Sequence, residues 1–212
     1  NGFRYLLDLC KNTGVQRVFF SSSSEVYGEP FEHPQNEQTT PLNSRLPYAV
    51  VKNVGESFLR SYKQEFDLDY TIFRFFNTYG PKQSQDFVMS KFINAAVNGR
   101  DITIYGDGSQ TRTFCYRLDN VDACANAFYN NLHVNDTVNI GSDFEVSVLE
   151  LAQMIIEITN SKSKIVYLPP LKEGDMTRRK PDIGKMRDLL GRELTTIPDG
   201  IRRTIESNQY HY

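Results

Sequence analysis

Tyr48 and Lys52 lie four residues apart in the segment YAVVK. On a helix this spacing places the phenol and the ammonium group on one face, with their Cβ atoms about 5–6 Å apart. A tyrosine side chain ordinarily has a pKa of about 10, and a neighbouring cation favours its ionised form. Lys52, helped by a bound cationic nicotinamide, could make Tyr48 a general base at neutral pH. The alternative interpretation is a surface helix whose tyrosine and lysine have no joint role.

Four consecutive serines, Ser21–Ser24, and then Glu25 directly continue the apolar segment VQRVFF. The pattern over residues 15–22 predicts a buried strand. Ligands of open α/β sheets bind beyond the carboxyl ends of the strands, where these hydroxyls and the carboxylate would lie. A serine-rich linker is the alternative, but a linker does not directly continue a buried strand. Another apolar strand likewise ends in a polar turn, at Asn77 and Thr78.

The elements that must position these residues alternate between helices and strands. Apolar periodicity predicts helices over residues 3–12, 47–66, 86–98, 120–130 and 148–159. It predicts strands over residues 15–22, 70–76, 101–105, 137–141 and 165–168, and a surface loop over residues 29–46. Ser147 and Glu150 have the spacing of a capping box for the helix that follows. A helix that enters an apolar strand after a short glycine turn is typical of a parallel α/β sheet.

Composition and charge limit the functional classes. The 212 residues contain 24 Lys and Arg against 26 Asp and Glu, a formal net charge of −2. This balance gives no electrostatic argument for a protein that binds nucleic acid or a membrane surface. No apolar run approaches the roughly 20 residues that span a bilayer. Cys10, Cys115 and Cys124 are odd in number and far apart, so we expect reduced thiols in a cytoplasmic protein.

Two other catalytic classes lack their sequence signals. A serine hydrolase would carry a Gly-x-Ser-x-Gly elbow, and the sequence contains none. Metal catalysis would need clustered ligands, whereas His33, His133 and His211 are isolated in the sequence. We therefore expect no metal site.

The chain resembles extended short-chain dehydrogenases/reductases of the NAD-dependent nucleotide-sugar epimerase/dehydratase family. The matching segments, in family order, are SSSSEVYGEP, YAVVK, RFFNTYGP, ITIYGDGSQTRTF, VNIGS and GDMTRRKPD. They cover nearly the whole chain. The resemblance implies an α/β fold made of the C-terminal portion of a Rossmann-type parallel sheet and an interleaved, smaller α/β substrate-binding subdomain. It also implies NAD as cofactor, a nucleotide-sugar substrate that is UDP-linked by analogy, and a homodimer formed through a helix bundle.

The same resemblance divides the chain into two domains. Residues 1–81 would form the remainder of an NAD-binding Rossmann domain, and residues 113–145 would return to it. Residues 82–112 and 146–212 would form the nucleotide-sugar subdomain. We expect the substrate cleft between the two.

Catalytic roles also follow from the resemblance. Tyr48 would take the proton from a sugar hydroxyl while hydride passes from C4 to NAD⁺. Lys52 would favour the ionised tyrosine and bind the nicotinamide ribose, and Ser23 would hydrogen-bond the reacting oxygen. Ser21 and Phe75 would join the cofactor-binding residues.

The resemblance assigns a further set of residues to the substrate and its phosphates. Asn77 and Thr78 would touch substrate phosphate and cofactor, and Tyr105 would lie near the nucleotide base. Arg112 and Arg178 would clamp the diphosphate, because a planar guanidinium can bind phosphate oxygens in a bidentate manner.

Fewer residues indicate the subfamily. The Ser24-Glu25 pair before Val-Tyr-Gly, together with Arg179-Lys180-Pro181-Asp182, is similar to UDP-glucuronate decarboxylases, in which C4 oxidation yields a β-keto acid that loses CO₂. Glu25 and Arg179 would match active-site residues there, and UDP-xylose would be the product. The YAVVK helix is nearer the UDP-sugar 4-epimerases of UDP-glucose or UDP-glucuronate type, and residues 83–89 lack an arginine that decarboxylases usually carry. The 4-epimerase is therefore the alternative, and a non-catalytic nucleotide-sugar-binding or scaffold homologue is the alternative from another class.

One family feature is missing from these 212 residues. Family members begin with a strand and a Gly-x-x-Gly-x-x-Gly loop whose amides bind the cofactor pyrophosphate, and an acidic residue on the next strand holds the adenosine ribose. Gly106-x-Gly108 is no substitute, because it follows a short strand of the substrate half and opens no helix. On family analogy the start at Asn1-Gly2 matches a later helix, so we expect the first strands of the family domain to be absent. The isolated chain would then bind NAD weakly and have little activity.

Overall fold

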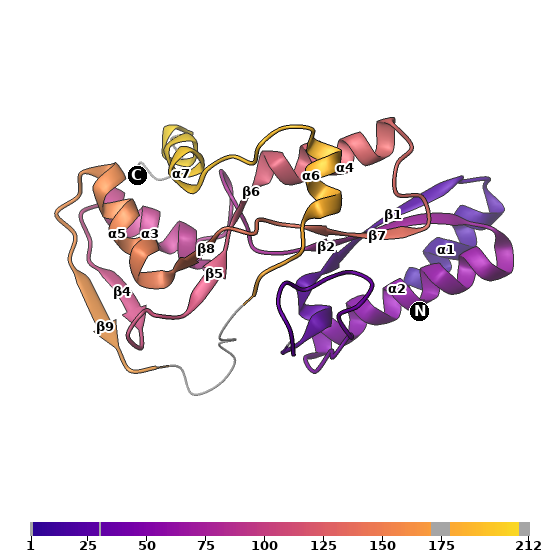
Figure 1. Ribbon diagram of the computed structural model, residues 1–212, viewed down its shortest axis with the longest axis horizontal. Helices are drawn as coiled ribbons and strands as arrows, with labels where there is room; N and C mark the ends of the chain where they lie inside the picture. Colours follow the sequence, from indigo (N-terminus) through magenta and orange to yellow (C-terminus); the bar gives the residue numbers. More distant parts are fainter. Residues whose placement is uncertain (1, 30, 171–178, 208–212) are drawn as a thin grey trace. The chain divides into compact units, whose positions relative to one another are not determined.

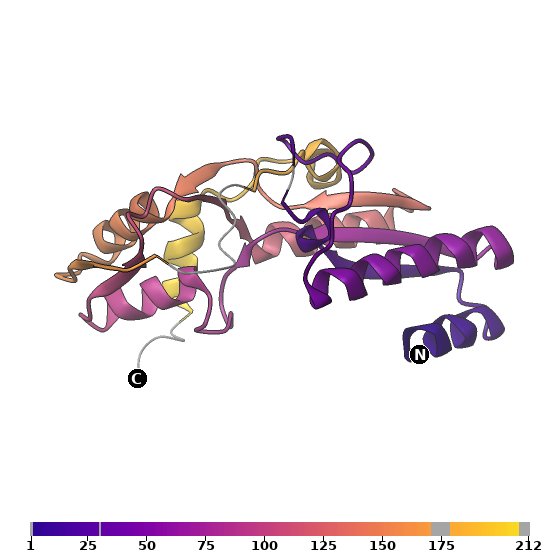
Figure 2. The same ribbon diagram turned by 90° about the horizontal axis from the view of Figure 1, so that it is seen from below.

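The computed structural model describes residues 2–29, 31–170 and 179–207 of the chain (Figures 1 and 2). It is a mixed α/β fold with a parallel sheet. Helices are interspersed with single strands and with runs of short strands, and a short 3-10 helix, η1, follows the first strand. The elements are α1 (Gly2–Asn12), β1 (Arg17–Ser23), η1 (Ser24–Tyr27), α2 (Pro47–Phe66), β2 (Asp69–Phe75), β3 (Thr78–Tyr79), α3 (Val88–Val97), β4 (Ile102–Tyr105), β5 (Thr111–Thr113), β6 (Cys115–Tyr116), α4 (Arg117–Tyr129), β7 (Asp136–Ile140), β8 (Glu145–Ser147), α5 (Val148–Thr159), β9 (Ile165–Leu168), α6 (Gly184–Leu190) and α7 (Ile197–Glu206).

The chain divides into two compact units, each assembled from three separate segments. The first unit comprises Asn1–Phe76, Val121–Gly141 and Pro181–Arg192. The second comprises Asn77–Asn120, Ser142–Lys180 and Glu193–Tyr212. In this division residues 181–192 lie in the first unit. The assignment of residues 1–81 with 113–145 to cofactor binding, and of 82–112 with 146–212 to substrate binding, stays a prediction.

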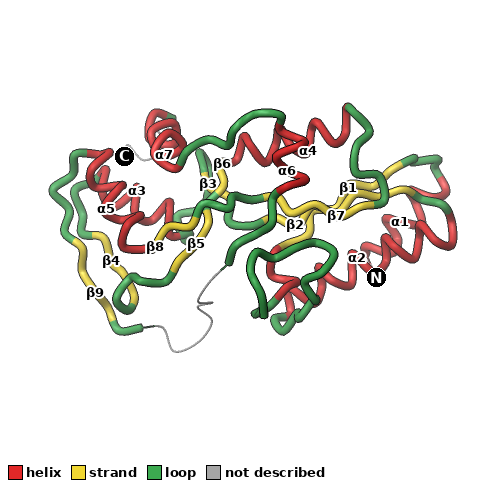
Figure 3. The backbone as a smooth tube through the Cα atoms, viewed as in Figure 1, coloured by secondary structure: helices red, strands yellow, loops and turns green. Residues whose placement is uncertain are grey.

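The first unit is built on a three-stranded parallel sheet in the order β1-β2-β7 (Figure 3). β2 is the central strand, and its residues from Tyr70 to Arg74 are buried. Such burial is typical of parallel strands covered on both faces, and it includes the polar side chains of Thr71 and Arg74. β1 pairs with β2 from Arg17 opposite Asp69 to Ser23 opposite Phe75. The strand therefore begins two residues later and ends one residue later than the predicted range 15–22.

Helix α2 packs along this sheet (Figure 2). It begins at Pro47, whose fixed φ suits the first turn, and it ends at Phe66 as predicted. Leu7 of α1, Leu59 and Tyr62 of α2 and Ile72 of β2 share one buried apolar cluster. Gly55 allows a close approach to the sheet, because a Cβ there would lie 2.5 Å from Cζ of Phe20.

The second unit has its own apolar core and short strand pairs. β4 pairs with β9 and β3 with β6, both in parallel, while β5 and β8 are antiparallel. Phe92, Ile93, Leu151, Ile155 and Ile201 are among its buried core residues. They bring helices α3, α5 and α7 together against the strands.

Several predicted boundaries of the second unit agree with the structure. The helix over residues 148–159 and the strand over 165–168 have their predicted ends. The predicted capping box is present: the Ser147 side chain accepts from the amide of Glu150, and the Glu150 side chain accepts from the amide of Ser147. α3 is shorter than the predicted 86–98, and α4 begins at Arg117, three residues before the predicted start.

The prediction of a surface loop over residues 29–46 is wrong in part. Gln35 and Thr40 are buried, and Gln35 forms an isolated β-bridge with Pro181. Asn139 Nδ2 of β7 donates to the Gln35 carbonyl at 2.9 Å, and Asn36 Nδ2 donates to Asp182 at 2.9 Å. These partners are more than a hundred residues away in the chain, so local composition gives no sign of them.

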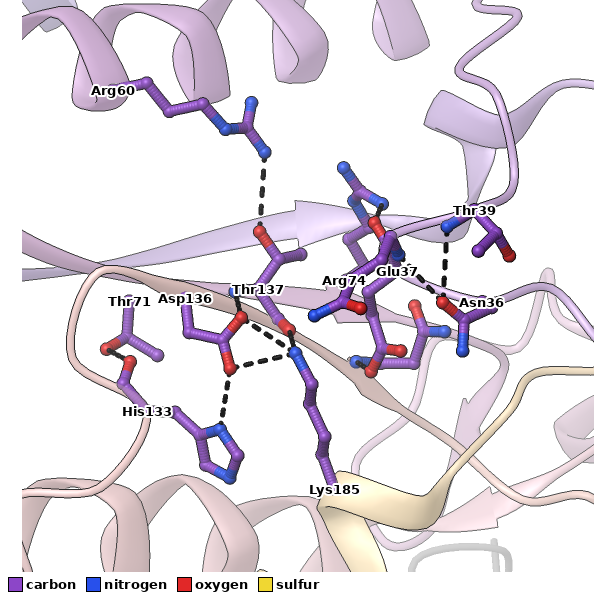
Figure 4. Close-up of polar contacts among 12 residues, drawn as sticks. Asn36, Glu37, Thr39, Arg60, Thr71, Arg74, His133, Asp136, Thr137 and Lys185 are labelled. Carbon is purple, nitrogen blue, oxygen red and sulfur yellow. Dashed lines mark hydrogen bonds and ion pairs between the residues drawn. The ribbon is translucent and has the colours of Figure 1, made fainter.

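A polar cluster fixes the start of β7 (Figure 4). Lys185 Nζ of α6 donates to both carboxylate oxygens of Asp136, at 2.7 and 2.8 Å. His133 Nδ1 lies 2.9 Å from the same carboxylate. Partial burial by itself would raise the pKa of Asp136, but the hydrogen bonds from Lys185 and His133 outweigh it and lower this pKa. His133 and Lys185 thus both hold the carboxylate of Asp136.

The described ranges, residues 2–29, 31–170 and 179–207, bear on membrane and metal binding. Within them, no helix combines the length and the apolar character that crossing a membrane requires. Groups of three or more His, Cys, Asp or Glu side chains suited to a metal ion are also absent from this described part. The three cysteines are free thiols.

Candidate active site

The serine run lies at the carboxyl end of β1 and opens η1. Ser23 caps η1, and its Oγ accepts a hydrogen bond from the amide of Glu25 at 3.2 Å. Ser23 and Ser24 are buried, Glu25 is half-buried and the neighbouring Ser21 is exposed. The run therefore belongs to the sheet edge, as predicted from its continuity with an apolar strand.

Lys52 connects the tyrosine helix to this strand end. Its Nζ donates to the carbonyl oxygen of Ser21 at 2.7 Å and lies 5.6 Å from the centre of the Tyr48 ring. The same Nζ lies 5.4 Å from the ring of Phe20 in β1. Tyr48 itself is 56% exposed, so its hydroxyl is open to a ligand. The i, i+4 spacing on α2 thus places a phenol and an ammonium group together at the carboxyl edge of the sheet.

A buried ionic network lies beneath these residues, and the sequence analysis missed it. It comprises Ser22, Tyr27, Glu56 and Arg74, all almost inaccessible to solvent. Two signals could have revealed it. Glu56 continues the four-residue spacing from Lys52, and Arg74 is a charge within an apolar strand, which demands a buried partner.

Phe75 ends β2 opposite Ser23, and it is half-buried. Asn77 and Thr78 belong to the second unit, where both side chains have partners. Asn77 Nδ2 donates to the Thr113 carbonyl at 3.1 Å. Thr78 Oγ1 accepts from Asn120 at 2.7 Å. Their predicted contacts with phosphate and cofactor stay predictions.

Tyr105 and Arg112 line one cavity in the second unit. The cavity has a volume of about 290 Å³. Tyr105 is 43% exposed and ends β4, while Arg112 is half-buried in β5. The same cavity is lined by residues that the sequence analysis missed, of which Asp86, Lys91, Thr103 and Gln110 are polar. The two cations, Lys91 and Arg112, outnumber the carboxylate of Asp86, so the cavity with its aromatic rings could hold a ring-bearing anion such as a nucleotide.

The structure says less about the two remaining predicted arginines, Arg178 and Arg179. Arg178 lies outside the described residues. Arg179 is half-buried, and the neighbouring Lys180 forms an ion pair with Glu145 at 3.4 Å in the second unit.

The residues around Lys52 fit one end of a dinucleotide cofactor. A cation at the carboxyl end of a parallel strand, beside an exposed serine, suits the hydroxyls of a ribose. The amide-rich glycine loop that would hold a pyrophosphate does not occur in these 212 residues. The residues around Lys52 therefore suit only the nicotinamide end of the cofactor.

Comparison with known families identifies the chain. Residues 1–141 match the NAD dependent epimerase/dehydratase family, which confirms the resemblance of its motifs, and the chain belongs to this family. It is 36% identical over 208 residues to UDP-glucuronic acid decarboxylase 1 of Danio rerio, covering 95% of this chain and 49% of that protein. It is 37% identical over 196 residues to UDP-glucuronic acid decarboxylase 3 of Arabidopsis thaliana, covering 89% of this chain and 56% of that protein. The chain spans about half the length of the curated relatives it matches.

Solved structures agree with this assignment. UDP-glucose 4-epimerase from Thermotoga maritima, determined with UDP-glucose, superimposes with a TM-score of 0.89 at 30% identity, covering 98% of this chain and 68% of that one. UDP-glucuronic acid 4-epimerase from Bacillus cereus, in complex with UDP-glucuronic acid and NAD, gives a TM-score of 0.87 at 27% identity, covering 99% and 67%. The cofactor is NAD, as in the family and in the Bacillus cereus structure.

Proposed function

We propose that the whole protein modifies a UDP-linked sugar through transient oxidation at C4, with Tyr48 as the base. The observation that carries this proposal is the placement of Lys52, which joins the Tyr48 ring to the serine end of β1. UDP-sugars bound in relatives of the same fold support the substrate class.

The chain's own residues divide the work at the reacting carbon. Tyr48 Oη takes the proton of the C4 hydroxyl, and the positive charge of Lys52 favours the ionised phenol. Ser23 orients the C4 oxygen by a hydrogen bond. Bound beside Lys52 and Ser21, NAD⁺ would supply the acceptor for the hydride of C4. Glu25 and Ser24 follow Ser23 in η1, where a carboxylate could act on the neighbouring part of the sugar ring.

The cavity of Tyr105 and Arg112 is the proposed place of the nucleotide. Tyr105 would stack on the base, and Arg112 would contact the diphosphate together with Arg178, while Lys91 adds a second cation to this cavity. Asn77 and Thr78 would contribute to phosphate and cofactor binding.

Within this class, UDP-glucuronate decarboxylation to UDP-xylose is our first proposal. It is supported by the similarity to decarboxylases of fish and plants and by Glu25 and Arg179 in the matching motifs. Oxidation at C4 would give a β-keto acid, which loses CO₂. A UDP-sugar 4-epimerase is the second candidate, favoured by the YAVVK helix and by the epimerase folds.

Product masses test both candidates. The whole protein is incubated with NAD⁺ and a panel of UDP- and dTDP-sugars, and the products are analysed by mass spectrometry. We expect UDP-glucuronate to lose the mass of CO₂. An unchanged mass with altered chromatographic mobility would favour the epimerase, and loss of water would favour a dehydratase. Binding without any conversion would favour the non-catalytic homologue.

A homodimer formed through helices is the proposed assembly. Helices α1 and α2 expose apolar side chains, including Leu6, Leu9, Val51 and Val54. Val51→Lys should shift sedimentation of the whole protein towards the monomer, because a charge in an apolar interface is costly. Val121→Lys, at an exposed valine of α4, is the control that should leave the assembly unchanged.

A further inference from the structure

One buried guanidinium connects both parts of the candidate active site in the first unit. Arg74 lies in β2 and is 1% exposed, while Glu56 of α2 is fully buried. Arg74 Nε and Nη2 donate to the two carboxylate oxygens of Glu56, at 3.0 and 2.7 Å. Such a bidentate pair fixes orientation as well as distance.

The Glu56 side of this pair holds the tyrosine–lysine helix against β1. Ser22 Oγ donates to Glu56 Oε1 at 2.6 Å, and the carbonyl of the adjacent Ser21 accepts from Lys52 at 2.7 Å. Glu56 follows Lys52 by about one helical turn. Two successive turns of α2 are thus bound to two successive residues of β1. These two contacts fix the position of α2, and with it Tyr48, along the direction of the strand.

The other side of the pair holds η1. Arg74 Nη1 donates to Tyr27 Oη at 2.9 Å, and Tyr27 Oη donates in turn to Asn139 of β7 at 2.8 Å. Tyr27 is fully buried and ends the short helix that contains Ser24 and Glu25. Arg74 Nη1 also contacts the Glu37 carbonyl, at 3.5 Å (Figure 4).

The hydrogen-bond donors around Glu56 keep the Glu56–Arg74 pair ionised. Arg74 faces it from β2, Ser22 from β1, and Arg60 Nη2 from its own helix at 3.1 Å. Burial alone would raise the pKa of Glu56, but the hydrogen bonds and charge of Arg74, with Ser22 and Arg60, outweigh burial and lower it. Buried ion pairs often add little net stability compared with apolar side chains, so stability alone is a weak reason for this pair.

We propose that Glu56 and Arg74 are positioning residues, which set Tyr48 and Lys52 on α2 against Ser23 and Glu25 at the end of β1. The inference rests on the proposed function, because it assigns to Tyr48 the role of base. A displacement of about 1 Å between reacting groups can lower turnover about a hundredfold. The pair therefore controls the rate without touching the substrate.

The separate effects on kcat and KM in the whole protein test this inference. Glu56→Gln keeps the shape of the side chain but removes the charge that holds the guanidinium. We expect kcat to fall about 10- to 100-fold, with KM for the sugar nucleotide changed by less than about twofold. Glu65→Gln, at an exposed glutamate of the same helix, should change neither quantity.

A merely structural role gives a different result. Loss of folded protein lowers kcat only in proportion to the folded fraction, which circular dichroism measures, so kcat per folded molecule stays at the wild-type value. Ser22→Ala, which keeps the Glu56–Arg74 pair, should lower kcat per folded molecule by a smaller factor with KM unchanged, and it decides the matter if Glu56→Gln does not fold. A wild-type kcat per folded molecule in the folded variants would overturn the inference. Wild-type protein that converts no sugar nucleotide would instead overturn the proposed function.

Discussion

At the scale of single residues, the chemistry of the first unit depends on a lysine with two partners. Lys52 Nζ reaches both the ring of Tyr48 and the carbonyl of Ser21. The tyrosine–lysine spacing alone is compatible with an ordinary surface helix. The contact with Ser21 is what places the pair at a sheet edge where ligands bind.

Tyr48→Phe tests the assigned base most directly. The substitution removes only the hydroxyl oxygen of an exposed side chain, so folding should be unaffected. In the whole protein we expect turnover to fall at least about 100-fold, the usual contribution of a general base, while isothermal titration finds sugar-nucleotide affinity largely retained. Tyr129→Phe, at an exposed tyrosine of α4, is the control. Undiminished turnover would reject Tyr48 as the base.

At the scale of elements, the serine strand end is held by a tight turn after η1. Gly28 has a φ of 59° and caps η1. A Cβ at this position would lie 2.0 Å from the backbone oxygen of Asn43. Both the left-handed backbone and the close approach therefore require glycine there.

Gly28→Ala should consequently destabilise the first unit. We expect a loss of about 2–4 kcal/mol in the free energy of unfolding, because a backbone atom cannot yield as a flexible side chain can. Urea denaturation measures it. Gly2→Ala, where nothing lies within 4 Å, should change stability by less than about 1 kcal/mol. Equal effects of the two substitutions would contradict this account of Gly28.

The contact between α6 and β7 predicts a pH-dependent contribution to stability. The pKa of Asp136 is lowered in the folded state, so its contribution is full above the ordinary value of about 3.9 and is lost as pH falls through the lowered value. Asp136→Asn should cost about 1 kcal/mol near neutral pH, where solvent screens the half-exposed pair. In denaturation series the difference from wild type should shrink steadily below about pH 4. A difference that is constant down to strongly acidic pH would exclude the ion pair as its cause.

At the scale of the whole molecule, the family uses NAD, but these 212 residues contain only part of the groups that usually bind it. The chain belongs to an NAD-dependent family, and Lys52, Ser21 and Tyr48 suit the nicotinamide end of the cofactor. The sequence contains no glycine-rich loop for the pyrophosphate. In dinucleotide-binding folds, such amides at a helix N-terminus bind the pyrophosphate.

The 212 residues by themselves should therefore bind NAD weakly. Isothermal titration of this chain is expected to give an affinity weaker than the micromolar range, and the whole protein should bind more tightly under the same conditions. Lys52→Met, which removes the ammonium group, should reduce the residual affinity further. Micromolar affinity of the 212 residues alone would show that other groups hold the pyrophosphate.

The sequence by itself determined the order of the longer helices and strands, the ends of α2, α5 and β9, and the two local groupings of serine, tyrosine and lysine. These depend on apolar periodicity, capping residues and helical spacing, which act between neighbours in the chain. Only the tertiary structure decided that Arg74 meets Glu56 and that Gln35 is buried beside Pro181. It also brought Tyr105 and Arg112 into one cavity. Such contacts join residues from separate strands, helices and loops, and they form because buried charges and amides must find partners wherever packing brings them.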